Sequence, residues 1–143
     1  MVRKIIAQTR RVVHRKGHPA ARAQEFSTEK LATLPQLEIS SAQFGPDFVD
    51  AVPGRSKPNL KAAMRAPFLS AAQILVTSDL VSVLPLNVAK TLTRSHPLVF
   101  HRLSRSPKPI EAAMIWLRRL DNQPAHAWLR DVINHVANGL RST

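Results

Sequence analysis

The sequence has no cysteine, no tyrosine and only four glycines among its 143 residues. Without cysteine there is no disulfide framework and no thiolate chemistry, which fits a reducing cytoplasm. The scarcity of glycine argues against a phosphate-binding loop, and the sequence contains neither a G-x-G-x-x-G fingerprint nor a G-x-S-x-G nucleophile elbow. The aromatic content of 5% argues against the stacking platforms on which many proteins hold single-stranded RNA or DNA.

Long apolar runs and acidic side chains are also scarce. No run approaches the roughly 20 residues of a membrane-spanning helix, and no secretory signal pattern opens the chain. The chain has nine acidic residues and 21 Lys and Arg residues, which gives a formal net charge of +12, and no acidic residue precedes Glu25. Three interpretations of the basic residues 3–22 stay open: a solvated or partner-facing surface, non-specific binding of nucleic acid, and an arginine-rich targeting segment.

Candidate catalytic and metal-binding residues are few. His14 and His18 have the i, i+4 spacing of zinc ligands on a helix, but Gly17 and Pro19 interrupt any helix there. The other histidines lack acidic or cysteine companions at ligand spacing, so we expect exposed or core histidines. Asp47 is better placed as a helix cap than as a catalytic carboxylate. We therefore expect no enzyme, no catalytic residue, no metal and no cofactor.

Apolar runs separated by turn residues predict alternating strands and helices. The expected strands cover residues 9–15, 37–40, 59–65, 80–84 and 98–103, and the expected helices cover residues 27–34, 68–76 and 86–94. The run Leu80 to Leu84 is nearly all apolar, as in a strand that is covered on both faces. Helices between apolar strands indicate an α/β fold with a mainly parallel sheet.

The segment from Met114 to Val136 predicts an apolar strand, a turn and an amphipathic helix. Asn122 can cap this helix, and Pro124 stands near its first position, where a missing N–H costs nothing. Gly139 is expected to mark its end. One apolar stripe follows the helix at Ala125, Trp128, Leu129, Val132, Ile133, Val136 and Leu140. Such a stripe must dock against another surface.

Two junctions at the carboxyl ends of expected strands form the best candidate binding site. They are Ser40-Ser41 and residues 66–70, which include Pro67 and Phe68. In open α/β sheets ligands bind at this edge, and a helix N-terminus there offers free N–H groups to an anion. The alternative is that Ser40, Ser41 and Ser70 only cap the backbone.

Four motifs, in order along the chain, carry a family resemblance. They are the strand and His-Pro turn of residues 12–19, the helix, Ser-Asp-Leu-Val turn and Leu-Pro strand of residues 68–85, Trp116 to Arg119, and Pro124 to Arg130 (PAHAWLR). Together, residues 9–140 resemble the second half of the effector-binding domain of LysR-type transcriptional regulators, nearest to the NodD-like branch. One departure is Leu117, which replaces the usual histidine.

The resemblance implies a periplasmic-binding-protein type 2-like fold that senses a small-molecule inducer, possible classes being aromatic or organic acids. It implies a basic extension over residues 1–8, the second effector-binding subdomain over residues 9–110, and a return strand and C-terminal helix of the first subdomain over residues 111–143. Ser40, Ser41, Pro67 and Phe68 would line the effector pocket.

The resemblance further implies that this chain is incomplete. The first half of the first subdomain and the winged helix that contacts DNA would be absent, as in a truncated regulator or gene remnant. The helical stripe around Trp128 would then be exposed, and self-association through it is expected. The alternative function is that of a small basic protein binding nucleic acid non-specifically. Neither interpretation involves a membrane.

Overall fold

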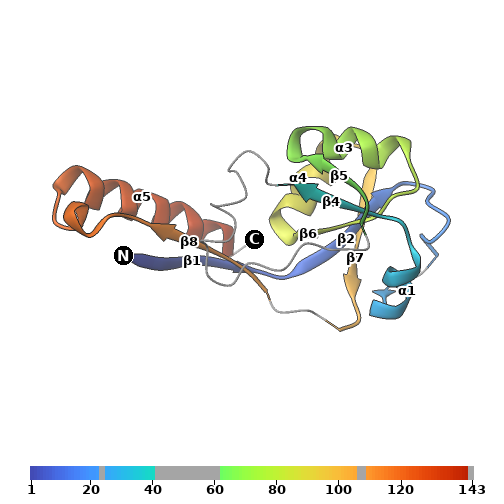
Figure 1. Ribbon diagram of the computed structural model, residues 1–143, viewed down its shortest axis with the longest axis horizontal. Helices are drawn as coiled ribbons and strands as arrows, with labels where there is room; N and C mark the ends of the chain where they lie inside the picture. Colours follow the sequence, from blue (N-terminus) through green and yellow to red (C-terminus); the bar gives the residue numbers. More distant parts are fainter. Residues whose placement is uncertain (23–24, 41–61, 106–108, 142–143) are drawn as a thin grey trace. The chain divides into compact units, whose positions relative to one another are not determined.

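The computed structural model describes residues 1–22, 25–40, 62–105 and 109–141 (Figure 1). The chain divides into two compact units. The central unit comprises Arg10–Ser106, and the terminal unit combines Met1–Thr9 with Pro107–Thr143 from the other end of the chain. None of the helices in the described part is long and apolar enough to cross a membrane.

The central unit is built on a mixed sheet. Its four-stranded part has the order β3-β7-β2-β6, with β3 at Glu25–Phe26, β7 at Leu98–Leu103, β2 at Arg10–Arg15 and β6 at Ser82–Pro85. β2 runs antiparallel to β6 and β7, while β3 is parallel to β7. The expected mainly parallel sheet therefore needs a correction at β2. No crossover helix precedes β2, and only parallel neighbours need one.

A parallel pair, β4 (Gln36–Ser40) and β5 (Ala62–Pro67), continues from this sheet. Gln36 forms a parallel bridge with Val81, directly before β6. The buried Ser82 hydroxyl donates to the Leu37 carbonyl at 2.9 Å and fastens the same two segments. Strand β4 therefore runs in the direction of β6.

Neighbouring side chains of β2 belong to two hydrophobic clusters on opposite faces of the sheet. Neighbouring strand residues point to opposite faces, and both Val12 and Val13 are fully buried. Val13 belongs to the cluster that includes Leu75 of α3 (Phe68–Thr77) and Leu92 of α4 (Leu86–Ser95). Val12 packs in a second cluster with Phe26 and with residues on and just after α1 (Thr28–Thr33). The unit is thus covered on both faces.

Local sequence explains where these helices begin. The Ser27 hydroxyl accepts the Lys30 N–H at 3.1 Å and caps α1, as a serine at this position predicts. Pro67 and Pro85 are the N-cap residues of α3 and α4. The helices expected over residues 68–76 and 86–94 are confirmed to within one residue.

The terminal unit pairs the two ends of the chain. Strand β1 (Val2–Gln8) is antiparallel to β8 (Ile110–Ile115), with Val2 opposite Ile115. The 3₁₀ turn η2 (Arg118–Leu120) leads to the helix α5 (Pro124–Arg141), which contacts β1. The segment expected as a basic extension thus contains the strand Val2–Gln8, in which Ile6 is buried and the β8 backbone supplies partners.

The α5 helix departs from the sequence prediction at Gly139 and at Ile133. It begins at Pro124 and runs through Gly139 to Arg141. The Cβ position of Gly139 faces open space, so this glycine is not required by packing and does not end the helix. The inward side uses Arg130, Ile133 and Ala137. Most of the predicted stripe is exposed, with Trp128 at 67% and Val136 at 57%, whereas Ile133 is half-buried.

Candidate functional site

The predicted binding residues meet at the carboxyl ends of β4 and β5. Ser40 and Pro67 are register partners in this parallel pair. Two residues before this pair, the Arg65 Nε donates a hydrogen bond to the Glu38 carboxylate at 2.7 Å and links the two strands. Ser41 lies outside the described residues, as does Asp47. The structure therefore brings together Ser40 and the residues at the start of α3.

Exposed apolar side chains occur on β5 and in the first turn of α3, next to this junction in the sequence. Phe68 is 45% exposed, and Met64 and Leu69 are also exposed. Because proline has no side-chain oxygen, Pro67 makes no side-chain cap for the first turn of α3. The Ser70 hydroxyl donates to the Pro67 carbonyl at 3.1 Å, which fits the alternative backbone role for this serine. We call Met64, Pro67, Phe68 and Leu69 the junction patch.

One member of this patch, Met64, lies outside the predicted junction of residues 66–70. Met64 lies on an expected strand and shares a face with the buried Ala66 by strand alternation, so the sequence pattern points it inward and gives no signal of its exposure. Leu69 belongs to the predicted junction and lies on a helix that buries Ala71, Ala72 and Leu75. It lies in the first turn of α3, before the buried residues of the helix, and its side chain is exposed.

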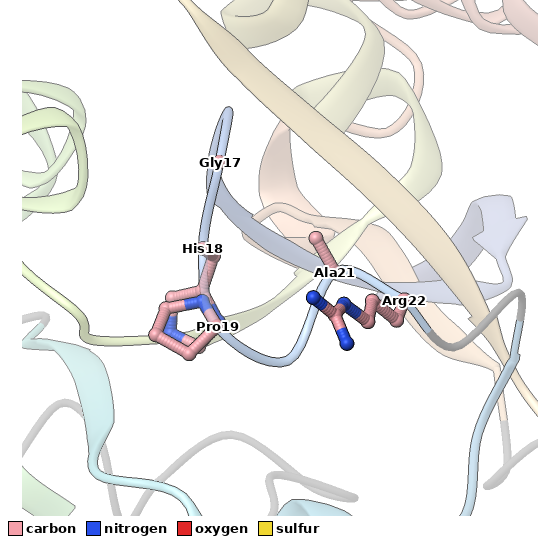
Figure 2. A pocket seen from close by; sticks show the side chains of 5 residues that line it. All are labelled: Gly17, His18, Pro19, Ala21 and Arg22. Carbon is pink, nitrogen blue, oxygen red and sulfur yellow. The ribbon is translucent and has the colours of Figure 1, made fainter.

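Two surface hollows lie at the other ends of the strands of the central unit, away from the junction patch. One, of about 540 Å³, is lined by Gly17, His18, Pro19, Ala21 and Arg22 on the loop after β2 (Figure 2). The other, of about 400 Å³, is lined by Arg15 and by residues 76–79 between α3 and β6. Both adjoin the amino ends of the parallel strands, whereas ligands of open α/β sheets bind at the carboxyl ends.

The turn between these hollows is firmly fixed. Gly17 has a φ of 72°, in the left-handed region that favours glycine. The His18 Nε2 lies 2.9 Å from the Asp79 carbonyl, and the Arg15 guanidinium pairs with the Asp79 carboxylate at 2.6 Å. This corner has a structural role in joining β2 to the turn before β6.

Two histidines lie in the interior of the central unit. His14 and His18 are buried. Among the described residues, no group of three or more histidine and acidic side chains is arranged to hold a metal ion. Burial lowers the pKa of His14, and the neighbouring His101, His18 and Arg15 lower it further against the raising effect of a hydrogen bond to the Arg15 carbonyl.

The basic residues near the N-terminus do not form one strip on one unit. Arg3 and Lys4 belong to β1, and Lys4 pairs with Glu111 at 2.7 Å. Arg10 and Arg15 belong to β2 in the central unit. Lys4 and Arg15 thus form ion pairs within their own units.

Comparison with known proteins agrees with this architecture. A family model described as the LysR substrate binding domain matches residues 2–138. The HTH-type transcriptional regulator SyrM of Rhizobium etli is 35% identical over 124 residues, which cover 81% of this chain and 34% of that protein. SyrM of Rhizobium meliloti strain 1021 is 30% identical over 139 residues, covering 95% and 42%. The chain spans less than half the length of these curated relatives.

Solved structures show the same fold. A transcriptional regulator from Vibrio parahaemolyticus has a TM-score of 0.76 at 25% identity, covering 100% of this chain and 67% of that one. The regulatory domain of MexT from Pseudomonas aeruginosa has a TM-score of 0.71 at 19% identity, covering 94% and 66%. The effector binding domain of QuiR in complex with shikimate has a TM-score of 0.64 at 14% identity, covering 96% and 66%.

Proposed function

Because this chain belongs to the family of LysR substrate-binding domains, we propose that it binds a small organic-acid effector at the junction patch together with Ser40 and Ser41. The family consists of transcriptional regulators and is non-enzymatic. The observation that carries the proposal is the pairing of Ser40 with Pro67 at the carboxyl edge of a parallel strand pair, where α3 begins.

The chemistry of the junction supports an acid with an apolar or ring-shaped body. An anionic group is stabilised near the N-terminus of a helix by the free N–H groups of the first turn, and Pro67 places no capping side chain over that turn of α3. Phe68 and Met64 provide half-exposed apolar surface for the rest of the ligand. Shikimate, which is present in the QuiR structure, has this combination of a carboxylate and a ring.

Titration of the chain with shikimate and with benzoate, followed by NMR chemical shifts, tests this proposal. A one-sided, open site predicts weak binding, with a Kd of about 1 mM. The largest shifts are expected in the amides of residues 68–70. Phe68→Ala should weaken binding about tenfold, whereas Val136→Ala, another exposed apolar residue but on α5, should leave it unchanged. Equal binding by both variants would contradict the assignment, as would shifts confined to the hollow at Gly17.

The expected assignment of subdomains forms part of the proposal. We assign residues 9–110 to the second effector-binding subdomain and residues 111–143 to the return of the chain into the first. The division into a central unit of Arg10–Ser106 and a terminal unit supports it, with β1 added to the terminal unit. In this assignment DNA is contacted through a winged helix outside this sequence, and the site of action is the cytoplasm.

Self-association through α5 completes the proposal. Trp128, Val132 and Val136 recur every four residues and are exposed together with Leu129 and Leu140. A single helical stripe is self-complementary, because two copies related by a two-fold axis bury the same residues. An exposed apolar surface of this kind marks an interaction site in most proteins.

A further inference from the structure

Three histidine rings and one phenylalanine ring are packed together in the central unit. The ring centroid of His14 lies 5.0 Å from those of His18 and His101, and the His14 and His101 rings are stacked with an interplanar angle of 13°. Phe26 closes the group, with ring centroids 5.8 Å from His14 and 5.5 Å from His101. His14 and Phe26 are completely buried. We call these four residues the histidine cluster.

The hydrogen bonds of the cluster are those of neutral imidazoles. The Ala20 N–H donates to His18 Nδ1 at 2.9 Å, so this nitrogen carries no hydrogen, and Nε2 is left to donate to the Asp79 carbonyl. His14 Nδ1 lies 2.8 Å from the Arg15 carbonyl and must therefore be the donor. The remaining His14 Nε2 and the His101 Nε2 are buried without a hydrogen-bond partner among the described residues.

A proton added to this cluster would meet an unfavourable environment. On His14 it would create a buried N–H with no acceptor, and on His18 it would remove the acceptor of the Ala20 N–H. Both events would take place within a single core, because the rings are in contact. Like charges so close together also repel.

The charged groups around the cluster strengthen this effect. Arg15 follows His14 in the chain and forms an ion pair with Asp79, whose side chain is more than half exposed. The Lys30 ammonium lies 5.2 Å from the centre of the Phe26 ring. Glu25, beside Phe26 on β3, is exposed to solvent. No buried carboxylate among the described residues is positioned to compensate a charged imidazole.

We propose that the histidine cluster is a proton-sensitive lock: because the packed, neutral His14 cannot accept a proton without loss of packing, mild acid favours opened forms in which the turn from Gly17 to Arg22 leaves the corner at Asp79 and the central unit loosens. His18 is the link, because its ring joins the turn to that corner, and Figure 2 shows it on the same short loop as Arg22. The inference concerns the edge of the sheet opposite the proposed effector site and stands independently of effector binding.

The direction of the pH effect follows from His14. Its pKa is lowered in the folded protein, mainly by burial, so the unfolded chain takes up a proton more readily. The contribution of His14 to stability is therefore complete above about pH 6.5, the ordinary value for histidine, and is lost as the pH falls below it. We expect a decrease in Tm on the order of 5 °C between pH 7.5 and pH 5.5.

Thermal unfolding of the full chain and of His14→Phe at several pH values between 5.5 and 7.5 provides the test. His14→Phe should flatten the pH dependence, whereas His135→Gln, which removes an exposed histidine on α5, should keep the wild-type slope. Equal slopes in all three proteins would overturn the proposal. Should His14→Phe not fold, His14→Asn, which also removes the titrating imidazole but keeps a donor for the Arg15 carbonyl, serves the same comparison.

A measurement on the wild-type protein supports or refutes the lock without any variant. Hydrogen exchange of the Ala20 amide should lose protection between pH 7 and pH 5.5, after correction for the intrinsic rate. The Ala127 amide, which donates to the Gln123 carbonyl at the start of α5 at 2.9 Å, lies in the terminal unit, is the internal control and should keep its protection. Unchanged protection of Ala20 would show that acid does not release the turn.

Discussion

The guanidinium of Arg15 and the carboxylate of Asp79 form an ion pair at 2.6 Å that joins strand β2 to the turn before β6. Both side chains are partly exposed, with side-chain exposures of 32% and 57%. Water therefore screens this pair, while the neighbouring His18 contacts are buried within the same corner. The position of the turn depends more on the histidine than on the ion pair.

Asp79→Asn is therefore expected to have a small effect. Exposed ion pairs contribute about 0.2 to 1 kcal/mol to the free energy of unfolding, and salt screens them. His18→Ala should cost about 2 kcal/mol or more, because it leaves the buried Ala20 N–H and the Asp79 carbonyl without their partner. Urea denaturation at low and high salt distinguishes the two. A larger loss for Asp79→Asn would contradict this ranking.

Leu75 of α3 should be the residue of this helix most sensitive to truncation. It is fully buried in the cluster with Val13 and Leu92, and Leu→Ala changes in such a core cost about 2 to 5 kcal/mol. Leu69→Ala, on the same helix but 86% exposed, should change the free energy of unfolding by less than about 0.5 kcal/mol. Equilibrium denaturation of the pair measures the contrast, and similar losses would show that the packing of α3 is assigned wrongly.

Arg130→Lys should destabilise the terminal unit although it preserves the charge. The Arg130 guanidinium lies 4.8 Å from the centre of the Trp116 ring and donates to the Leu120 and Asp121 carbonyls at 3.3 and 2.6 Å. A lysine cannot reproduce a planar donor that serves two acceptors and a ring. We expect a loss of about 1 to 2 kcal/mol, together with a changed Trp116 fluorescence. An unaltered spectrum and stability would count against this role.

Val136→Asp should abolish self-association while the chain remains folded. Val136 is 57% exposed at the centre of the α5 stripe, so a carboxylate there stays solvated in the monomer and would be buried only between two copies. Sedimentation velocity at several concentrations measures the change. Asn138→Asp, an exposed residue off the stripe, is the matched control. A wild-type chain that stays monomeric at high concentration would refute association through α5.

Elements whose signals are local could be predicted from the sequence. Pro67 and Pro85 each precede an apolar helical pattern, and α3 and α4 begin directly after them. Ser27 caps α1 as its side chain suggests. For the binding site, the strand ends at Ser40 and Pro67 were predicted separately, and the parallel register pairs them.

Contacts between distant residues could not be predicted in the same way. Strand β1 has two charged residues among its first three, and its partner β8 lies more than 100 residues away, so no local pattern indicates the pair. The stacking of His14 on His101 follows from the β2–β7 register and not from any spacing in the sequence. Gly139 was misinterpreted because a glycine without a tight turn is tolerated inside a helix.

The pairing of β1 with β8 also affects how the chain folds. Closing a loop over the whole of the central unit costs conformational entropy before any strand contact compensates for it. Contacts of such long sequence separation form slowly, whereas those within β6, α4 and β7 join neighbours in the chain. The central unit should therefore acquire its structure early and the terminal unit late, and in a nascent chain β1 must wait for the last thirty or so residues before its partner exists.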